Sequence, residues 1–231
     1  MNWTLRHCWL PLATVLLIAA DPSWKEKPIP QWAEEEAKQV LADSPWVKFV
    51  TPEPLRDLSE AERRDSGNWE ADSGHGVGLA GTGLFGRRRA AEAIARAHAK
   101  PRPGTVAVRW ESALPIRAAE QKTGETGVPT VDRDHYAIAI YDIPTPNKWN
   151  MAHELKGVAF LKRDKKKDVK PSSVEILRQP GGKATVVYLF PRSVEITARD
   201  GRLEFVAQIG RLFVSQFFYT QEMQLQGKLE L

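Results

Sequence analysis

The second half of the chain is a succession of short apolar segments separated by turn residues, and this pattern limits the possible folds more than any other feature of the sequence. The segments are rich in β-branched, leucine and aromatic residues, which favour strands, and glycine or proline often stands between them. We predict strands over residues 105–110, 136–141, 158–162, 173–177, 184–190, 195–198, 203–209, 212–219 and 223–231.

The last of these segments alternates most clearly. Polar residues separate Met223, Leu225, Leu229 and Leu231, as expected for a strand with one face in water. Glycine-containing turns at 180–182 and 200–201 indicate hairpins, because glycine adopts a positive φ at little cost. A short helix over 112–121 is expected between the first two strands.

Short strands joined by tight turns pair in antiparallel fashion. We therefore predict a mainly β protein, an antiparallel β-sandwich or open barrel, with a short N-terminal helix and a glycine-rich linker. The predicted division of the chain is a signal peptide over 1–20, an N-terminal helical segment over 21–50, a disordered glycine-rich linker with a weak alanine-rich helix over 51–103, and an antiparallel β domain over 104–231.

The first twenty residues have the order of a secretory signal. Arg6 precedes an uncharged apolar run over 9–20 that ends in Ala19 and Ala20. The run is shorter than the ~20 apolar residues that span a bilayer, so we predict cleavage after Ala20, no transmembrane span afterwards, and a periplasmic or extracellular location. The alternative is an uncleaved membrane tether. The single cysteine, Cys8, lies before the run, which argues against lipidation.

The N-terminal helix is expected over 30–42. Its apolar residues recur at helical spacing, Pro30 suits the first helical position, and the acids at 34–36 lie near the positive end of the helix dipole. Pro45 ends the helix, because a proline disfavours helical geometry in the residue before it.

Four short strings have a familiar appearance. They are Asp43-Ser44-Pro45-Trp46, the stretch 108–117 (VRWESALPIR), Phe190-Pro191-Arg192 and the stretch 227–231 (GKLEL). Together they resemble a group of exported bacterial proteins of the acidobacterial type, a group with no known activity. The resemblance implies an exported protein with a glycine-rich stretch between two parts, and it gives no indication of an activity.

Charge gives little guidance to a partner. The net charge is +4, with 33 basic and 29 acidic residues. The basic runs at 87–109 and 162–170 contain no Phe, Tyr or Trp that could stack on bases, so we predict no nucleic-acid binding. The run at 162–170 is interpreted as a solvated hairpin tip.

No pattern predicts a cofactor, a metal or a catalytic residue. The glycines at 76–81 match G-x-G-x-x-G, but no buried strand precedes them, as a dinucleotide site requires. Asp132, Asp134 and His135 form a cluster of potential metal ligands, for which a solvated turn is the preferred interpretation. The balance of these observations is against an enzyme.

Three arginines are the candidate ligand-binding residues, because each adjoins apolar strand or helix positions: Arg109, Arg117 and Arg192. They could line a pocket for an anionic ligand. The alternative is a set of structural ion pairs with acids such as Glu111 or Glu195.

The tryptophans divide into two groups. Trp32, Trp46 and Trp110 stand in periodic or strand contexts and are predicted to lie in the core. Trp24, Trp69 and Trp149 stand in polar surroundings, where they could line a carbohydrate surface.

Two hypotheses about function follow. The first is a non-enzymatic exported β-sandwich that binds a partner protein or another envelope component, such as a polysaccharide, through its faces or loops. The second is a hydrolase or a binder of small anionic ligands that uses the arginine-lined pocket.

Overall fold

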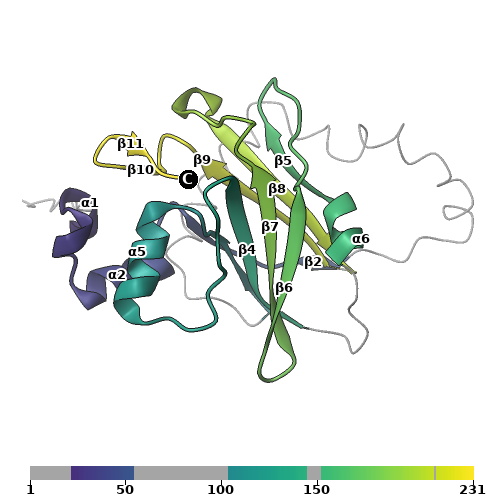
Figure 1. Ribbon diagram of the computed structural model, residues 1–231, viewed down its shortest axis with the longest axis horizontal. Helices are drawn as coiled ribbons and strands as arrows, with labels where there is room; N and C mark the ends of the chain where they lie inside the picture. Colours follow the sequence, from purple (N-terminus) through teal and green to yellow (C-terminus); the bar gives the residue numbers. More distant parts are fainter. Residues whose placement is uncertain (1–21, 55–103, 145–151, 211) are drawn as a thin grey trace, which may run out of the picture.

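The computed structural model describes residues 22–54, 104–144, 152–210 and 212–231 (Figure 1). The predicted signal peptide and nearly all of the predicted linker lie outside these residues, as do Trp69, Trp149 and the glycines at 76–81.

Antiparallel strands are the main regular secondary structure of the described chain. The strands are β1 (Val47–Val50), β2 (Glu53–Pro54), β3 (Val106–Trp110), β4 (His135–Pro144), β5 (Ala159–Arg163), β6 (Ser173–Gln179), β7 (Lys183–Pro191), β8 (Arg202–Ile209), β9 (Leu212–Tyr219), β10 (Gln224–Leu225) and β11 (Lys228–Leu229). The helices are α1 (Ser23–Glu26), the 3-10 helix η1 (Ile29–Gln31), α2 (Glu34–Ala42), α5 (Leu114–Thr123), α6 (Ala152–Gly157) and the 3-10 helix η3 (Ala198–Asp200).

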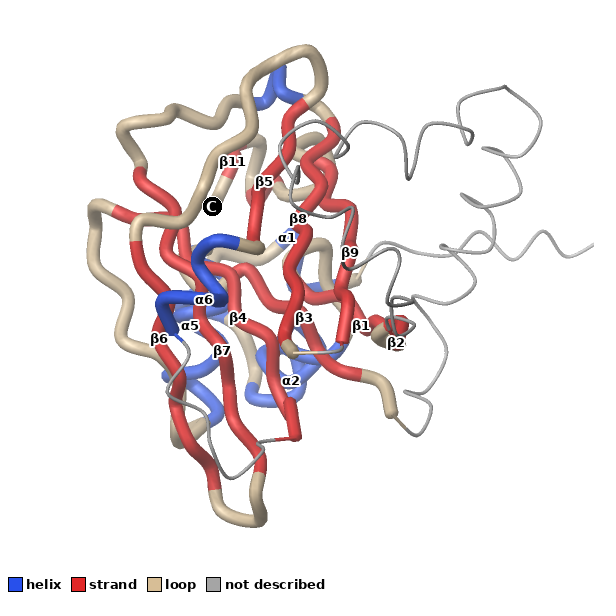
Figure 2. Tube along the Cα trace, turned by 90° about the vertical axis from the view of Figure 1, so that its right-hand side faces the viewer, coloured by secondary structure: helices blue, strands red, loops and turns tan. Residues whose placement is uncertain are grey.

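The strands form two main sheets, and Figure 2 shows the five-stranded sheet spread out from β6 at the left to β1 at the right. One sheet has the order β1-β3-β4-β7-β6 and the other the order β2-β9-β8-β5, and neighbouring strands in both are antiparallel. β10 and β11 form a small separate hairpin. The chain is therefore mainly β and antiparallel, as the sequence predicted.

Aromatic rings join the facing sides of the two sheets. Phe205 of β8 packs edge-on against Tyr188 and Phe190 of β7, with ring centres 5.3 and 6.2 Å apart. Trp110 of β3 packs in the same way against Phe218 of β9, at 5.4 Å. All five rings are fully buried. Burial of such large apolar surfaces supplies the main stabilisation of a sandwich.

The helices at the N-terminal end close one end of this core. Trp24 of α1 packs against Trp32 and Trp46, with ring centres 6.1 and 5.9 Å away. Glu36 of α2 holds α1 in place, because Oε1 accepts hydrogen bonds of 2.6 Å from Ser23 and from Lys27. Helices α1, α2 and α5 lie together beside the five-stranded sheet in Figure 1, and α2 packs on α5.

Most of the predicted strands are confirmed, with boundaries that differ by a few residues. The turn at 180–182 connects β6 to β7, and Gly181 and Gly182 have φ values of 80° and 72°. Positive φ at two successive central residues is the geometry of a tight hairpin turn. The helix predicted over 112–121 is α5, which begins two residues later. Trp32, Trp46 and Trp110 are buried as predicted.

The predicted strand over 223–231 is wrong, because the chain reverses in its middle. Gln226 and Gly227 have φ values of 51° and 77°, and they form the turn between β10 and β11. The main-chain oxygen of Met223 accepts a 3.1 Å hydrogen bond from the Glu230 amide. Alternation survives the reversal because both arms turn apolar side chains toward the core, as with the buried Met223, Leu225 and Leu231.

The predicted strand over 195–198 is also wrong. The side chain of Asp200 accepts hydrogen bonds from the Thr197 amide and hydroxyl, at 2.8 and 3.0 Å, and so forms η3 instead. Side chains of this kind compete with strand pairing for backbone donors. The turn at 200–201 therefore follows a 3-10 helix and does not close a hairpin.

Two expectations for the N-terminal region differ from the structure. The α-helix begins at Glu34, and Pro30 lies in the separate turn η1. Trp24 is 1% exposed, so it belongs to the core and not to a surface.

β1, β2 and α6 were not predicted from the sequence. β1 pairs with β3, and β2, although it falls at the start of the predicted linker, pairs with β9.

Candidate functional site

A buried polar network lies on the outward face of the five-stranded sheet, with Arg109 of β3 at its centre. The Arg109 Nη1 atom is 3.3 Å from Glu120 Oε1 and 3.2 Å from Glu125 Oε1. Its Nε atom is 3.7 Å from Glu111 Oε1. The guanidinium also lies 4.5 Å from the centre of the Tyr141 ring, within the range of a cation–π contact.

Three parts of the chain bring these groups together. β3 supplies Arg109 and is followed directly by Glu111, while α5 supplies Glu120. Gly124 ends α5 with a φ of 65°, the left-handed conformation that glycine adopts most readily. This turn allows the Glu125 amide to donate a 3.1 Å hydrogen bond to the Glu120 carbonyl. The reversal places the Glu125 side chain next to Arg109.

A β-bulge in β4 positions Tyr141. The pairing of β4 with β7 shifts between Ile140 and Ile143, and Asp142 has a φ of 59°. Before the bulge, residues with odd numbers face outward, whereas Ile143 after it faces the core between the sheets. Tyr141 is the last outward residue before this change. Its hydroxyl donates a 2.6 Å hydrogen bond to Glu111 Oε1.

Burial governs the protonation of this network. Glu111 is 0% exposed; burial raises the pKa of its carboxyl well above the usual range, and the neighbouring Glu120 carboxyl raises it further. Burial and the neighbouring Glu111 carboxyl also raise the pKa of the Tyr141 hydroxyl far above its usual value. Burial therefore favours the protonated form of Glu111, and Tyr141 keeps its proton and remains a donor.

A second arginine, Arg117 of α5, extends the network. Arg117 Nη1 is 3.3 Å from Glu120 Oε2 and donates a 2.8 Å hydrogen bond to the Pro129 carbonyl. Two arginines, Arg109 and Arg117, face two carboxylates, Glu120 and Glu125. Arg109 and Glu120 are buried and Arg117 and Glu125 are partly exposed, so neither buried charge is left unpaired.

An open hollow of about 430 Å³ lies at the edge of this network. Its lining consists of Lys38, Leu41, Ala42, Phe49, Arg109, Thr123 and Glu125. Phe49 is 37% exposed, one of the few large apolar side chains of the described residues left so open to water. Arg109 and Glu125 belong both to the hollow and to the buried network, so the ion pair between them forms part of its wall.

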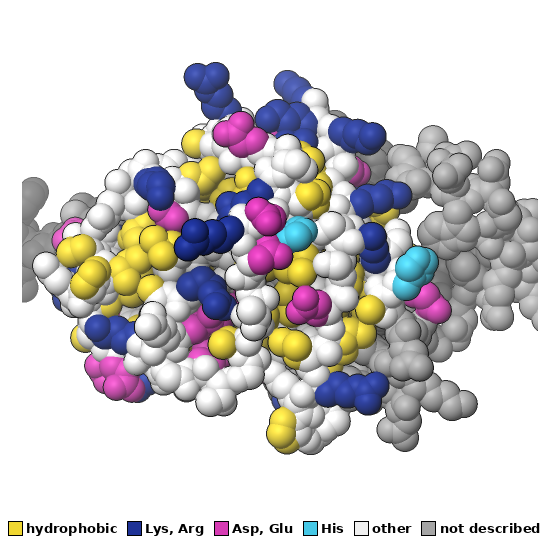
Figure 3. Space-filling view, viewed as in Figure 1, with side chains coloured by type: hydrophobic (Ala, Val, Ile, Leu, Met, Phe, Trp, Pro, Cys, Tyr) yellow, Lys and Arg dark blue, Asp and Glu magenta, His cyan; other side chains and the backbone are white. Residues whose placement is uncertain are grey.

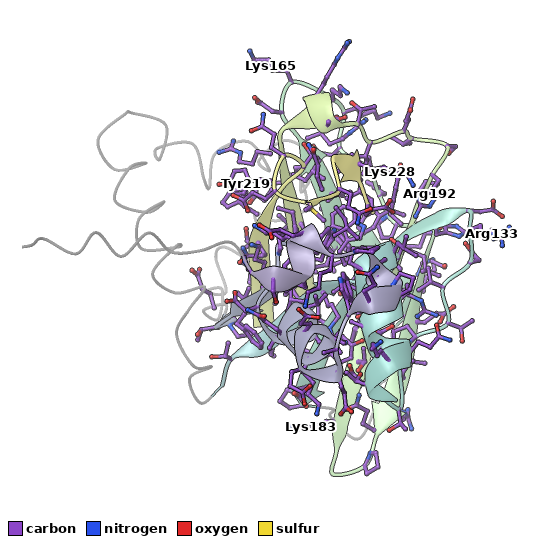
Figure 4. All side chains as sticks on the ribbon, turned by 90° about the vertical axis from the view of Figure 1, so that its left-hand side faces the viewer. Arg133, Lys165, Lys183, Arg192, Tyr219 and Lys228 are labelled. Atoms are coloured by element: carbon purple, nitrogen blue, oxygen red, sulfur yellow. The ribbon has the colours of Figure 1, made fainter. Side chains whose placement is uncertain are left out.

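The structure joins two of the three candidate arginines. Arg109 and Arg117 share the carboxylate of Glu120. Arg192 has different partners: its guanidinium lies 4.3 Å from the centre of the Tyr136 ring and its Nε donates a 3.1 Å hydrogen bond to the His135 carbonyl. Figure 4 shows Arg192 beside Lys228, near the last hairpin.

Arg192 holds the end of the chain against the sandwich. Its Nη2 atom donates a hydrogen bond to the main-chain oxygen of Leu231. Trp46 Nε1 donates one of 2.7 Å to the neighbouring carbonyl of Glu230. Glu195, which the sequence offered as an ion-pair partner, instead accepts a hydrogen bond from Arg163 through its main-chain oxygen.

The cluster around His135 is a local turn. Asp132 accepts hydrogen bonds of 2.9 Å from the Asp134 amide and 2.8 Å from His135 Nδ1. The His135 hydrogen bond lowers the pKa of the Asp132 carboxyl. Among the residues that the structure describes, no group of three or more His, Cys, Asp or Glu side chains could hold a metal ion.

Sequence reasoning missed three parts of the site. Tyr141 was placed in a strand, but nothing in the pattern located the bulge that turns it toward Glu111. Glu125 was not considered, although Gly124 before it is a signal for a helix end and a reversal of the chain. Phe49 was overlooked because the strand that carries it has only four residues.

Comparison with known proteins adds no relative. No protein-family model matches the chain, and neither a curated protein nor a solved structure matches it significantly. The resemblance to exported acidobacterial-type proteins stays a prediction. Within the described residues, no helix is long and apolar enough to cross a membrane.

Proposed function

We propose that this chain is an exported, non-enzymatic binding protein whose hollow at Phe49 receives a segment of a partner protein of the cell envelope. The observation that carries the proposal is the combination of an open hollow, an apolar wall made by Leu41, Ala42 and Phe49, and a half-exposed aromatic ring within it. Exposed apolar surface with a polar rim is typical of protein interfaces.

The shape of the hollow favours a macromolecule over a small molecule. Pockets for small ligands enclose most of the ligand surface. This hollow is open, so it covers one side of whatever enters it. A bulky apolar side chain that projects from a larger partner fits such a site, because the partner's surrounding surface then excludes water.

The edge of the sheet suits an extended partner segment. β1, which carries Phe49, is the terminal strand of the five-stranded sheet. Its second side has no strand partner among the described residues, so a segment from another protein could add main-chain contacts there while it inserts its side chain. The proposed partner is therefore an extended segment with a bulky apolar residue.

The chemistry of the polar network supports binding over catalysis. Glu111 is 0% exposed and Glu120 is 3% exposed, so a substrate has no access to either carboxyl. Carboxylates already occupy the guanidinium groups of Arg109 and Arg117. This occupation weighs against an anion pocket, because an incoming anion would have to displace them.

Photo-crosslinking in the producing cell tests the proposal. A benzophenone amino acid replaces Phe49 in one variant and Val158 in another, which is 38% exposed and follows α6. α6 lies on the opposite side of the molecule from α2, the helix that lines the hollow (Figure 1). We expect one dominant adduct at position 49, to be identified by mass spectrometry, and none at position 158. The same adducts at both positions, or none at either, would contradict the proposal.

Two further measurements test the predicted signal cleavage and the anion-binding alternative separately. Edman sequencing of the protein from the periplasm or medium is expected to begin at Asp21, whereas an intact Met1 would contradict cleavage after Ala20. A thermal-shift screen with phosphate, sulfate and citrate is expected to leave the midpoint unchanged. A saturable increase with one anion that requires Arg109 would favour the anion-binding alternative.

A further inference from the structure

The strongest unassigned surface lies at the end of the sandwich formed by the β5–β6 loop and η3. The segments 162–170 and 198–202 together carry eight basic side chains and three acidic ones. Figure 3 shows dark blue side chains along this upper rim, whereas both signs are interspersed lower on the face. We call Lys165, Lys167, Lys170, Arg199 and Arg202 the basic end, and all five are exposed.

A buried carboxylate holds the two loops of this end together. Asp200 Oδ1 is 2.8 Å from Lys166 Nζ and 3.6 Å from Arg163 Nη1, and the Asp200 side chain is 0% exposed. The basic end is thus a fixed arrangement of two loops. Asp200 pairs with Lys166 and Arg163. Among the described residues, three neighbouring cations have no carboxylate partner: Lys165, Lys167 and Arg199.

Aromatic rings lie directly beside these cations, on the outward face of the four-stranded sheet. Lys170 Nζ is 5.4 Å from the centre of the Phe160 ring, and the Arg202 guanidinium is 5.1 Å from that of Phe217. Tyr219, the register partner of Arg202, is 41% exposed. The sequence segment 162–170 contains no aromatic residue. The folded chain, and not the local sequence, brings the rings close to the cations.

We propose that the basic end and the adjoining aromatic face dock on an anionic lipid surface. Unpaired lysines and arginines are attracted to anionic headgroups, and half-exposed aromatic rings are favoured at the boundary between headgroup and hydrocarbon. Tyr219 has the required character, with an apolar ring and a polar hydroxyl. The proposal is independent of the hollow at Phe49 and goes beyond the function proposed above.

A lipid surface fits better than a nucleic acid. Bases stack on ring faces, and cations already lie over the rings of Phe160 and Phe217. Three of the five cations are lysines, which act as point charges and lack the planar fork with which arginine binds a phosphate in a bidentate manner. Attraction to an anionic bilayer depends on the summed positive charge and on exposed aromatic edges, and not on the orientation of each cation.

Vesicle co-sedimentation of the full processed protein tests the proposal. The vesicles contain phosphatidylcholine alone or phosphatidylcholine with phosphatidylglycerol, at low salt and at about 0.15 M salt. We expect binding to the anionic vesicles only, weakened by salt. Replacement of three cations of the basic end (K165E, K167E and R199E together) is expected to reduce the partition coefficient at least about tenfold.

A second triple variant controls for total charge. Lys122, Lys156 and Lys183 are also exposed, and K122E, K156E and K183E together change the net charge by the same amount. Lys165 and Lys183 lie at opposite ends of the molecule in Figure 4. The control is expected to stay within about twofold of wild type, and circular dichroism of both variants checks that the fold is retained.

Three results would overturn the proposal. The first is equal binding to neutral and anionic vesicles at low salt, and the second is an equal loss in both triple variants, which would indicate diffuse charge attraction. The third is tighter binding to a single-stranded oligonucleotide than to vesicles at equal phosphate concentration, which would favour a nucleic-acid partner. A Tyr219→Ser variant with reduced vesicle binding and unchanged oligonucleotide binding would support the lipid assignment.

Discussion

The hydroxyl of Tyr141 donates a 2.6 Å hydrogen bond to Glu111, and both side chains are buried on the outward face of the five-stranded sheet. The bond joins β4 to the residue that follows β3. Around it, Arg109 contacts both side chains, through its guanidinium over the Tyr141 ring and its Nε near the carboxyl. The network thus ties two neighbouring strands to α5 through Glu120.

Replacement of Tyr141 by phenylalanine removes one donor and keeps the ring under Arg109. A buried oxygen of Glu111 then loses its partner, so we expect the free energy of unfolding to fall by about 1–3 kcal/mol. Urea denaturation followed by tryptophan fluorescence measures the change.

Tyr188 provides a matched control for that variant. Its hydroxyl is buried and has no hydrogen-bond partner among the described residues. Tyr188→Phe removes an unsatisfied polar group and is expected to be neutral or stabilising by up to about 1 kcal/mol. Equal destabilisation by the two substitutions would show that the Tyr141 hydrogen bond contributes nothing specific.

Glu111→Gln is expected to change how stability depends on pH. Burial and Glu120 raise the pKa of Glu111 from its ordinary value of 4.5 in the folded state. Above pH 4.5 the unfolded chain releases a proton that the folded chain keeps, so the wild-type protein loses stability as pH rises toward the folded-state pKa. Glutamine cannot ionise, and its variant lacks this loss.

The stability difference between Glu111→Gln and wild type should therefore shift in favour of the variant as pH rises above 4.5. Chemical denaturation of both proteins across a pH series measures this difference, in which titrating groups far from Glu111 cancel. Glu175→Gln, at an exposed position of β6, is the control and should show no such trend. A difference that does not vary with pH would mean that Glu111 is ionised in the folded protein.

Arg192→Ala is expected to loosen the last hairpin. The variant loses the contact with Tyr136 and the hydrogen bonds to the main-chain oxygens of His135 and Leu231. We expect a loss of about 1–3 kcal/mol in the free energy of unfolding. Hydrogen exchange should rise over residues 223–231 and stay unchanged in β7. Arg199→Ala, at an exposed position, should leave exchange over 223–231 as in wild type.

The antiparallel β architecture was readable from the sequence because its signals are local. β7 and β8 are apolar runs bounded by turn residues, and the two glycines at 181–182 specify the hairpin directly. The strand predictions were wrong where one side chain or one turn residue decided between a strand and another local structure. Asp200 turned an extended segment into η3, and Gly227 divided a well-alternating segment into two arms.

The polar network could be predicted only in part. Glu111 was one of the acids that the sequence suggested as ion-pair partners of the three arginines, and its Oε1 lies 3.7 Å from Arg109 Nε. The positions of Tyr141 and Glu125 depend on a β-bulge and on the reversal at Gly124. Their contacts with Glu111 and Arg109 join residues that are far apart in the sequence. The contacts between rings and cations at the basic end also depend on pairing. Phe217 of β9 meets Arg202 because β9 pairs with β8, and Phe160 meets Lys170 because Leu161 and Val169 are bridged.

The affinity of the cross-linked partner tests the central claim, that the hollow at Phe49 is the binding surface. Isothermal titration calorimetry compares the wild-type chain with Phe49→Ala and with Val158→Ala, which is similarly exposed in the wild type. We predict that Phe49→Ala weakens binding at least about tenfold, as expected for an aromatic residue central to an interface, while Val158→Ala stays within about twofold. An unchanged affinity for Phe49→Ala, or an equal loss in both variants, would contradict the claim.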